Sequence, residues 1–167
     1  VPMSTYPGRK GNYKVENALG LYTTGYNSYK AWTDFDYVNQ DYTDSAPAAS
    51  AMATGEKIYD SALNVKIEDS SPLITLPQVA AQKGKSGGVV TSVELSHATP
   101  AGLGGAHNPD RNAYGEIAQE MFFDSNLSVI IGTGHPLYDN QGQSLNDPTY
   151  TWISENTWNA LQNGQIQ

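Results

Sequence analysis

The alternation of apolar and polar positions predicts helices interspersed with short buried strands from residue 44 to residue 163. Apolar runs predict strands at Gly87–Ser92 and Leu127–Ile131. Continuous runs of this kind are typical of strands that are buried on both faces of a parallel sheet. Four segments have the start and stop residues of helices, namely residues 44–55, 75–84, 116–123 and 154–163. The order of helices and strands indicates an α/β layered fold.

The helix at residues 44–55 has the clearest boundaries in the chain. Asp44 or Ser45 is its cap, and Pro47 lies in the first turn, where the missing N–H costs little. Five alanines form its body, and Gly55 supplies its stop. Since Met52 is the one large side chain on this helix, we expect other elements to pack closely against it on several sides.

The composition adds a loop-rich N-terminal region and excludes several classes of protein. We expect a short strand at Leu19–Tyr26 and an irregular loop or edge segment at Tyr29–Tyr42. The chain has 167 residues, a net charge of −8 and no cysteine, so it has no disulfide and no thiolate metal site. No run of about 18 apolar residues occurs, which predicts no membrane span. Without basic clusters, we expect no nucleic-acid-binding surface.

Two glycine-containing motifs imitate nucleotide-binding loops. Gly84-Lys85-Ser86 ends like a phosphate-binding loop, but Val79 stands where that motif needs glycine. The tripeptide also follows a helix and precedes a strand, which is the reverse of the required context. Gly132-Thr133-Gly134 follows a strand but lacks the third glycine of the dinucleotide motif. We interpret both motifs as turns.

Candidate chemistry lies at a helix start and behind the first strand. Ser45 is at a helix N-terminus, where free N–H groups favour an anion, so it is either a plain cap or a nucleophile beside an anion site. His97 and Thr99 follow the first strand, and in an extended chain they would share one face. A flexible stretch, Gly102–Gly105, comes next, and Arg111 follows it. Taken singly, each of these residues is ordinary.

Together these segments resemble the alkaline phosphatase family. Thr43–Lys57 and Tyr59–Val65 are similar to its nucleophile segment, and Val89–Ala101 is similar to its magnesium-site strand and loop. Arg111 is similar to its substrate-binding arginine, in the right order and spacing. The resemblance implies a three-layer α/β/α sandwich. Residues 1–167 would form an incomplete portion of one such domain, truncated at both ends.

The resemblance also implies hydrolysis of phosphate monoesters through a covalent phosphoserine at Ser45. Two zinc ions, one of them bound by Ser45, and one magnesium ion would assist. Arg111 would hold the phosphoryl group, and Asp44 would hold Arg111 in place. Thr99 would give an oxygen to magnesium, while His97 would contact the phosphate or lie in the second shell of the magnesium. A homodimer and a periplasmic or extracellular location are implied as well.

The histidines limit what this chain can build. His97, His107 and His135 have no paired metal-binding spacing, so the chain is expected to be a fragment, or a partner chain completes the site. We expect His107 to support its loop. Two alternatives remain open. One is a non-catalytic phosphate- or anion-binding module, and the other is a metal-free serine esterase that uses Ser45 with His97 or His107.

Overall fold

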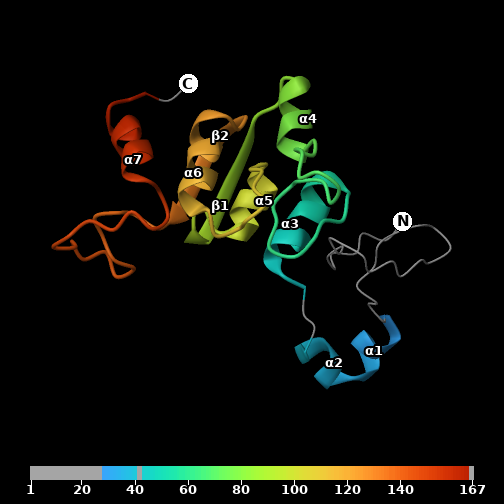
Figure 1. Cartoon of the computed structure of the whole chain (residues 1–167). Helices are drawn as coiled ribbons and strands as arrows, with labels where there is room; N and C mark the ends of the chain where they lie inside the picture. Colours follow the sequence, from blue (N-terminus) through green and yellow to red (C-terminus); the bar gives the residue numbers. More distant parts are fainter. Residues whose placement is uncertain (1–27, 41–42, 166–167) are drawn as a thin grey trace.

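The computed structural model describes residues 28–40 and 43–165, and its helices and strands follow the expected α/β order (Figure 1). The described helices are α1 (Ser28–Thr33), α2 (Phe35–Gln40), α3 (Ser45–Thr54), α4 (Leu76–Gln82), α5 (Ala98–Gly104), α6 (Tyr114–Phe123) and α7 (Glu155–Gln162). The described strands are β1 (Gly87–Glu94) and β2 (Leu127–Thr133). The strand predicted at Leu19–Tyr26 lies outside the described residues.

The two strands pair in parallel, as the sequence predicts. Val89 lies opposite Ile130, and α5 and α6 form the connection between β1 and β2. Side chains from α3, α5 and α6 form the main core, and Val89, Leu127 and Ile130 pack against it from the sheet. The prediction of an incomplete portion of an α/β fold is confirmed.

The prediction that both strands are buried on both faces is wrong for the part of the chain that the structure describes. Val90 is 74% exposed, and Ile131 is 56% exposed. These side chains alternate with Val89 and Ile130, which face the helices. The apolar run therefore reports strand formation correctly, but the described helices that pack on this sheet cover one face.

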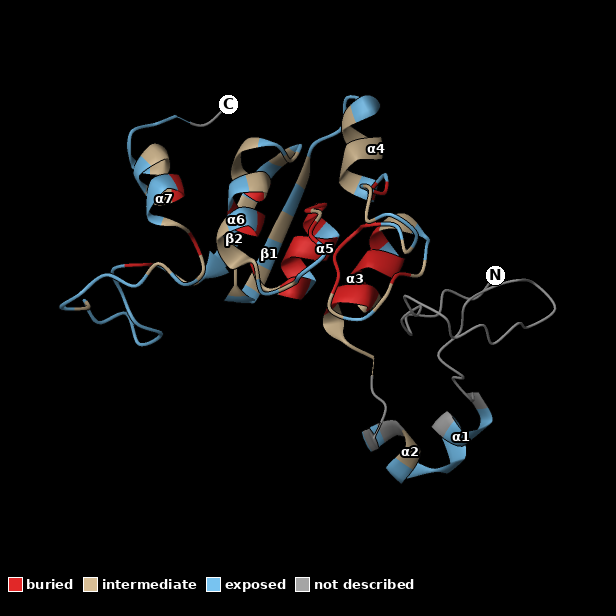
Figure 2. Ribbon diagram, viewed as in Figure 1, coloured by how far each residue is buried: buried red, intermediate tan, exposed pale blue. Residues whose placement is uncertain are grey.

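Helices α3 and α5 pack closely, as the small side chains of α3 predict. A Cβ atom added to Gly102 on α5 would lie 2.6 Å from the Cβ of Ala49 on α3, so only glycine fits there. Most residues of both helices are buried (Figure 2). Asn64 joins the pair, because its Nδ2 donates to the carbonyls of Gly102 and Ala106, both at 2.8 Å. The Asn64 backbone N–H also donates to the Ser50 hydroxyl on α3 at 2.9 Å, so this residue links α3 to the end of α5.

The segment after β1 differs from the sequence prediction. Ala98–Gly104 forms helix α5, with His97 at the N-cap position, so most of the stretch expected to be flexible, Gly102–Gly105, is helical. Gly105 ends the helix with φ of 91°, a conformation that glycine adopts without strain. His97 and Thr99 therefore do not share a face through extended-chain alternation, and that expectation is wrong.

The prediction of an irregular segment at Tyr29–Tyr42 is also wrong over the described residues, since α1 and α2 lie there. Asp34 explains the start of α2, because its Oδ1 accepts from the backbone N–H groups of Asp36 (3.1 Å) and Tyr37 (3.2 Å). Trp32 and Phe35 remain 90% and 83% exposed. The start of α2 thus follows from local capping by Asp34. Across residues 28–40 and 43–165, no helix combines the length and apolar character needed to cross a bilayer.

Candidate active site

Four predicted side chains, Asp44, Ser45, His97 and Arg111, come together in the structure, and we call them the serine–arginine site. Arg111 Nη1 pairs with Asp44 Oδ1 and also donates to Ser45 Oγ at 2.8 Å. Arg111 Nη2 lies 3.4 Å from His97 Nε2. The site therefore joins the N-terminus of α3, the N-cap of α5 and the loop between α5 and α6.

Asp44 is held in place by backbone donors as well as by the arginine. Its Oδ2 accepts from the N–H groups of Ala46 (3.2 Å) and Ser61 (3.3 Å). Ser61 also accepts the backbone N–H of Arg111 on its carbonyl at 2.7 Å. One residue thus contacts both members of the ion pair. It does so with φ of 65°, a left-handed backbone that serine adopts uncommonly.

The geometry of this site favours an anion. Ser45 begins a ten-residue helix, whose first N–H groups and dipole give a positive potential. The Asp44 and Arg111 side chains are 18% and 16% exposed, so solvent screens them only in part. Since Asp44 engages Nη1, the Nη2 edge of the guanidinium remains for a second acceptor such as a phosphoryl oxygen.

The structure places the two nearby histidines in different surroundings. His97 is half-buried and faces Arg111. His107 is bound on both ring nitrogens, by Glu120 Oε1 at 2.6 Å and by the Leu73 carbonyl at 2.8 Å. Burial lowers the pKa of His107, but these hydrogen bonds and the Glu120 charge outweigh it, and the net pKa is raised. Neither histidine donates to or accepts from Ser45 in the described residues.

Thr99 lies apart from the serine–arginine site in its bonding. It is exposed in the first turn of α5, and no hydrogen bond within the described residues joins it to Ser45, His97 or Arg111. Among residues 28–40 and 43–165, no group of three or more His, Asp or Glu could hold a metal ion. The described side chains therefore do not fit a complete zinc or magnesium site.

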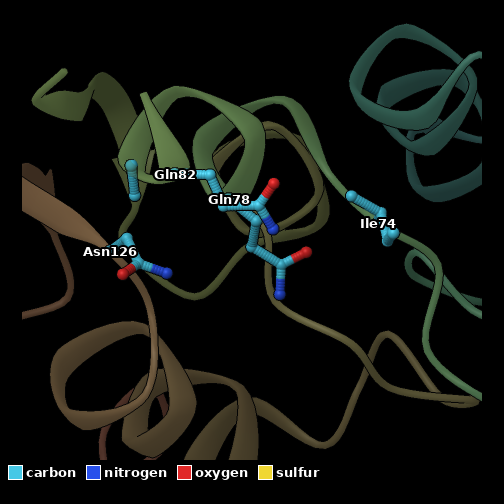
Figure 3. A pocket seen from close by; sticks show the side chains of 5 residues that line it. Ile74, Gln78, Gln82 and Asn126 are labelled. Carbon is cyan, nitrogen blue, oxygen red and sulfur yellow. The ribbon is translucent and has the colours of Figure 1, made fainter. Parts of the chain in front are cut away.

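A cavity of about 460 Å³ lies elsewhere, between α4 and the segment before β2 (Figure 3). It is lined by Ile74, Gln78, Ala81, Gln82 and Asn126. None of these residues carries a titratable or nucleophilic group, and Gln78 already caps α4 by accepting from the Thr75 N–H at 2.9 Å. This cavity offers no chemistry comparable to that of the serine–arginine site.

Sequence reasoning missed two residues that shape this region. Ser61 acts through its backbone groups, and no residue-type pattern marks that role. Trp152 lies near His97, with ring centroids 6.2 Å apart, although 55 positions separate them in the chain. A tryptophan in a polar loop was the one available signal, and it does not indicate which strand end the ring packs against.

Comparisons with known proteins agree on one family. A family model described as alkaline phosphatase matches residues 15–133, a range that includes the whole serine–arginine site. Alkaline phosphatase 3 of Bacillus subtilis (strain 168) is 36% identical over 115 residues, which are 66% of this chain and 24% of that protein. The chain therefore spans about a quarter of the length of this relative.

Two solved structures are similar as well. A cold-active alkaline phosphatase from the psychrophile Shewanella sp. is 33% identical, with a TM-score of 0.58 over 74% of this chain and 27% of that one. A mutant of TAB5 alkaline phosphatase, described with magnesium bound in a site named M3, is 36% identical. Its TM-score is 0.47 over 50% of this chain and 23% of that one.

Proposed function

Because this chain belongs to the alkaline phosphatase family, we propose that the protein hydrolyses phosphate monoesters at the serine–arginine site. The observation that carries the proposal is the bond from Arg111 Nη1 to Ser45 Oγ at 2.8 Å, with Asp44 fixing the guanidinium. It brings an anion-binding fork and a hydroxyl nucleophile to one helix N-terminus. We further propose that residues 1–167 are part of a single alkaline phosphatase-like domain.

In the proposed reaction, the phosphoryl group lies between the Nη2 edge of Arg111 and the N-terminus of α3, where the helix dipole is positive. Ser45 Oγ attacks phosphorus, the ester P–O bond breaks, and the alcohol leaves with the serine proton. Water then attacks the phosphoserine, which releases inorganic phosphate and restores the hydroxyl. His97 contacts the bound phosphoryl group beside Arg111.

Two zinc ions and one magnesium ion are proposed cofactors of the complete site. In the complete site, Ser45 would contribute an oxygen to zinc and Thr99 would contribute one to magnesium, while His97 would contact water bound to the magnesium. Since residues 28–40 and 43–165 hold no cluster of three ligands, the other ligands come from outside them.

Family membership also supports three coarser proposals about the whole protein. The substrates are small phosphate monoesters, the protein is exported to the periplasm or the medium, and it assembles as a homodimer. The first relative is a bacterial alkaline phosphatase, which supports the choice of these compartments. Fractionation of the producing cells and the mass of the native particle test the location and the assembly.

The contacts of Ser45 argue against the esterase, and covalent labelling tests the binding module. A metal-free esterase needs a base on the serine, but Ser45 bonds to Arg111 and to no histidine in the described residues. An anion-binding module would use the same arginine without forming a covalent bond. Covalent labelling therefore distinguishes hydrolysis from binding alone.

The test is acid trapping of the phosphoenzyme with radiolabelled inorganic phosphate, performed on the naturally produced protein. Ser45→Ala is expected to abolish the label. The matched control is Ser92→Ala, which removes an exposed hydroxyl on β1 and is expected to leave the label unchanged. Undiminished labelling of Ser45→Ala would exclude this nucleophile. An unlabelled native protein that still binds phosphate would favour the anion-binding module.

A further inference from the structure

The turn Gly132-Thr133-Gly134 at the end of β2 positions the side chain of Trp152. Gly134 has φ of 95°, and a Cβ atom there would lie 3.0 Å from the Cβ and 3.1 Å from the Cγ of Trp152. Glycine at this position lets the Trp152 side chain lie directly on the backbone of the turn. The turn therefore seats a large aromatic ring at the carboxyl end of β2, the edge where α/β sheets bind ligands.

Two further contacts fix Trp152. The buried Ser96 hydroxyl donates to the Trp152 carbonyl at 2.6 Å, which ties the loop before α7 to the end of β1. The ring of Tyr114, the first residue of α6, lies 4.3 Å from the Trp152 ring at an interplanar angle of 54°. Both rings remain half-buried. Together, Trp152 and Tyr114 form an aromatic wall, a name that we keep for this pair.

The aromatic wall adjoins the serine–arginine site. The Trp152 ring lies 6.2 Å from the His97 ring, and His97 Nε2 lies 3.4 Å from Arg111 Nη2. One side chain thus separates the wall from the guanidinium proposed to hold phosphate. Trp152 also lies beyond residues 15–133, so the family match does not account for it.

We propose that the aromatic wall binds the leaving group of a phosphate monoester whose alcohol carries an aromatic ring. The proposal rests on the proposed hydrolysis at Ser45. A molecule with a dianionic phosphate at one end and a flat ring at the other matches a guanidinium donor that one side chain separates from a pair of tilted rings. Aromatic rings prefer offset or edge-to-face partners. An aromatic leaving group would therefore bind the aromatic wall more favourably than an aliphatic leaving group on the same phosphate.

The experiment measures kcat/KM for phenyl phosphate and for glycerol phosphate on the naturally produced protein and its variants. Trp152→Leu removes the ring, and Trp152→Phe keeps an aromatic surface. The matched control is Trp158→Leu, because Trp158 is a half-buried tryptophan on α7 whose ring contacts His135 at 4.7 Å. Comparing the ratio of the two substrates between variants cancels the intrinsic reactivity of the aryl ester.

Trp152→Leu is expected to lower kcat/KM for phenyl phosphate roughly five- to tenfold and to leave glycerol phosphate within about twofold, the scale of one lost ring contact. Trp152→Phe is expected to retain most of the phenyl preference, and Trp158→Leu all of it. An equal loss for both substrates would show that Trp152 supports only the fold. No loss for either would also overturn the proposal.

A binding measurement separates this proposal from the proposed function. Calorimetry compares phenylphosphonate with methylphosphonate, neither of which can be hydrolysed as an ester. If the protein hydrolyses nothing but Trp152→Leu abolishes a preference for phenylphosphonate, the aromatic wall stands and the hydrolysis fails. If both phosphonates bind equally to the native protein, the aromatic wall is excluded whatever the protein hydrolyses.

Discussion

Two polar clusters at opposite ends of the α5–α6 loop each contain a histidine and a carboxylate, but they differ in the hydrogen-bonding groups that they leave for a ligand. In the serine–arginine site, the one partner that the described residues give to Arg111 Nη2 is a His97 ring nitrogen at 3.4 Å. The cluster of His107, Glu120 and the Leu73 carbonyl, which we call the His107 anchor, engages both ring nitrogens of His107 and both oxygens of Glu120. A polar cluster whose groups are satisfied within the chain stabilises the fold, while one with an unused donor can bind a ligand.

The largest expected effect concerns the serine–arginine site. Arg111→Ala removes the phosphate fork and leaves the Asp44 charge facing the anion, so phosphate affinity should fall by about 3 kcal/mol, or roughly 100-fold. Lys85→Ala, which removes an exposed cation beyond α4, is the control and should change the affinity little. Competition by inorganic phosphate measures both variants. An unchanged inhibition constant for Arg111→Ala would contradict the assignment.

The next largest effect concerns the His107 anchor. His107→Leu leaves Glu120 and the Leu73 carbonyl without their partner, so the free energy of unfolding should fall by about 2 kcal/mol. His135→Leu, at an exposed histidine with ring contacts, should cost less than about 1 kcal/mol. Denaturant unfolding measures both variants. Equal losses of unfolding free energy in the two variants would show that the His107 anchor stabilises the fold no more than an exposed histidine does.

The pH dependence sharpens the same comparison. Hydrogen bonds raise the pKa of His107 above its ordinary value of 6.5, so the folded protein favours the protonated ring. The resulting stabilisation is complete below the unfolded pKa and is lost as the pH rises through the folded pKa. The stability difference between the native protein and His107→Gln should therefore shrink with rising pH in that window. A difference that grows with pH would reverse the assigned sign.

The smallest expected effect concerns Ser61, which supports the serine–arginine site. Ser61→Gly keeps the N–H donor to Asp44 and suits the φ of 65°, so the free energy of unfolding should stay within about 1 kcal/mol of the native value. Ser61→Pro removes the donor and cannot adopt this φ. It should weaken phosphate binding, while Ser61→Gly should not. Phosphate competition on the two variants checks the difference.

The parts that the sequence predicted correctly depend on local signals. The α3 helix has its cap at Asp44 and its stop at Gly55, and both lie where the residue types place them. The parallel strands follow from apolar runs flanked by helices. The resemblance brought Ser45 and Arg111 together before any geometry was available, although 66 positions separate them.

The parts that it did not predict depend on contacts between distant segments. The glycine at position 102 of α5 is required by close packing against Ala49 on α3, a contact that residue types alone do not report. The support that Ser61 gives to Asp44 comes from its backbone, which residue type does not report. Trp152 reaches His97 only because the loop before α7 returns to the end of β1.

The most direct test of the central claim is to locate the phosphate after the naturally produced protein is quenched in acid during turnover of a phosphate monoester. Peptide mass spectrometry should find a phosphoryl group on Ser45 and none on the nearby Ser50 or Ser61. Turnover with phosphate on another residue, or with no phosphorylated peptide at any quench time, would contradict the account.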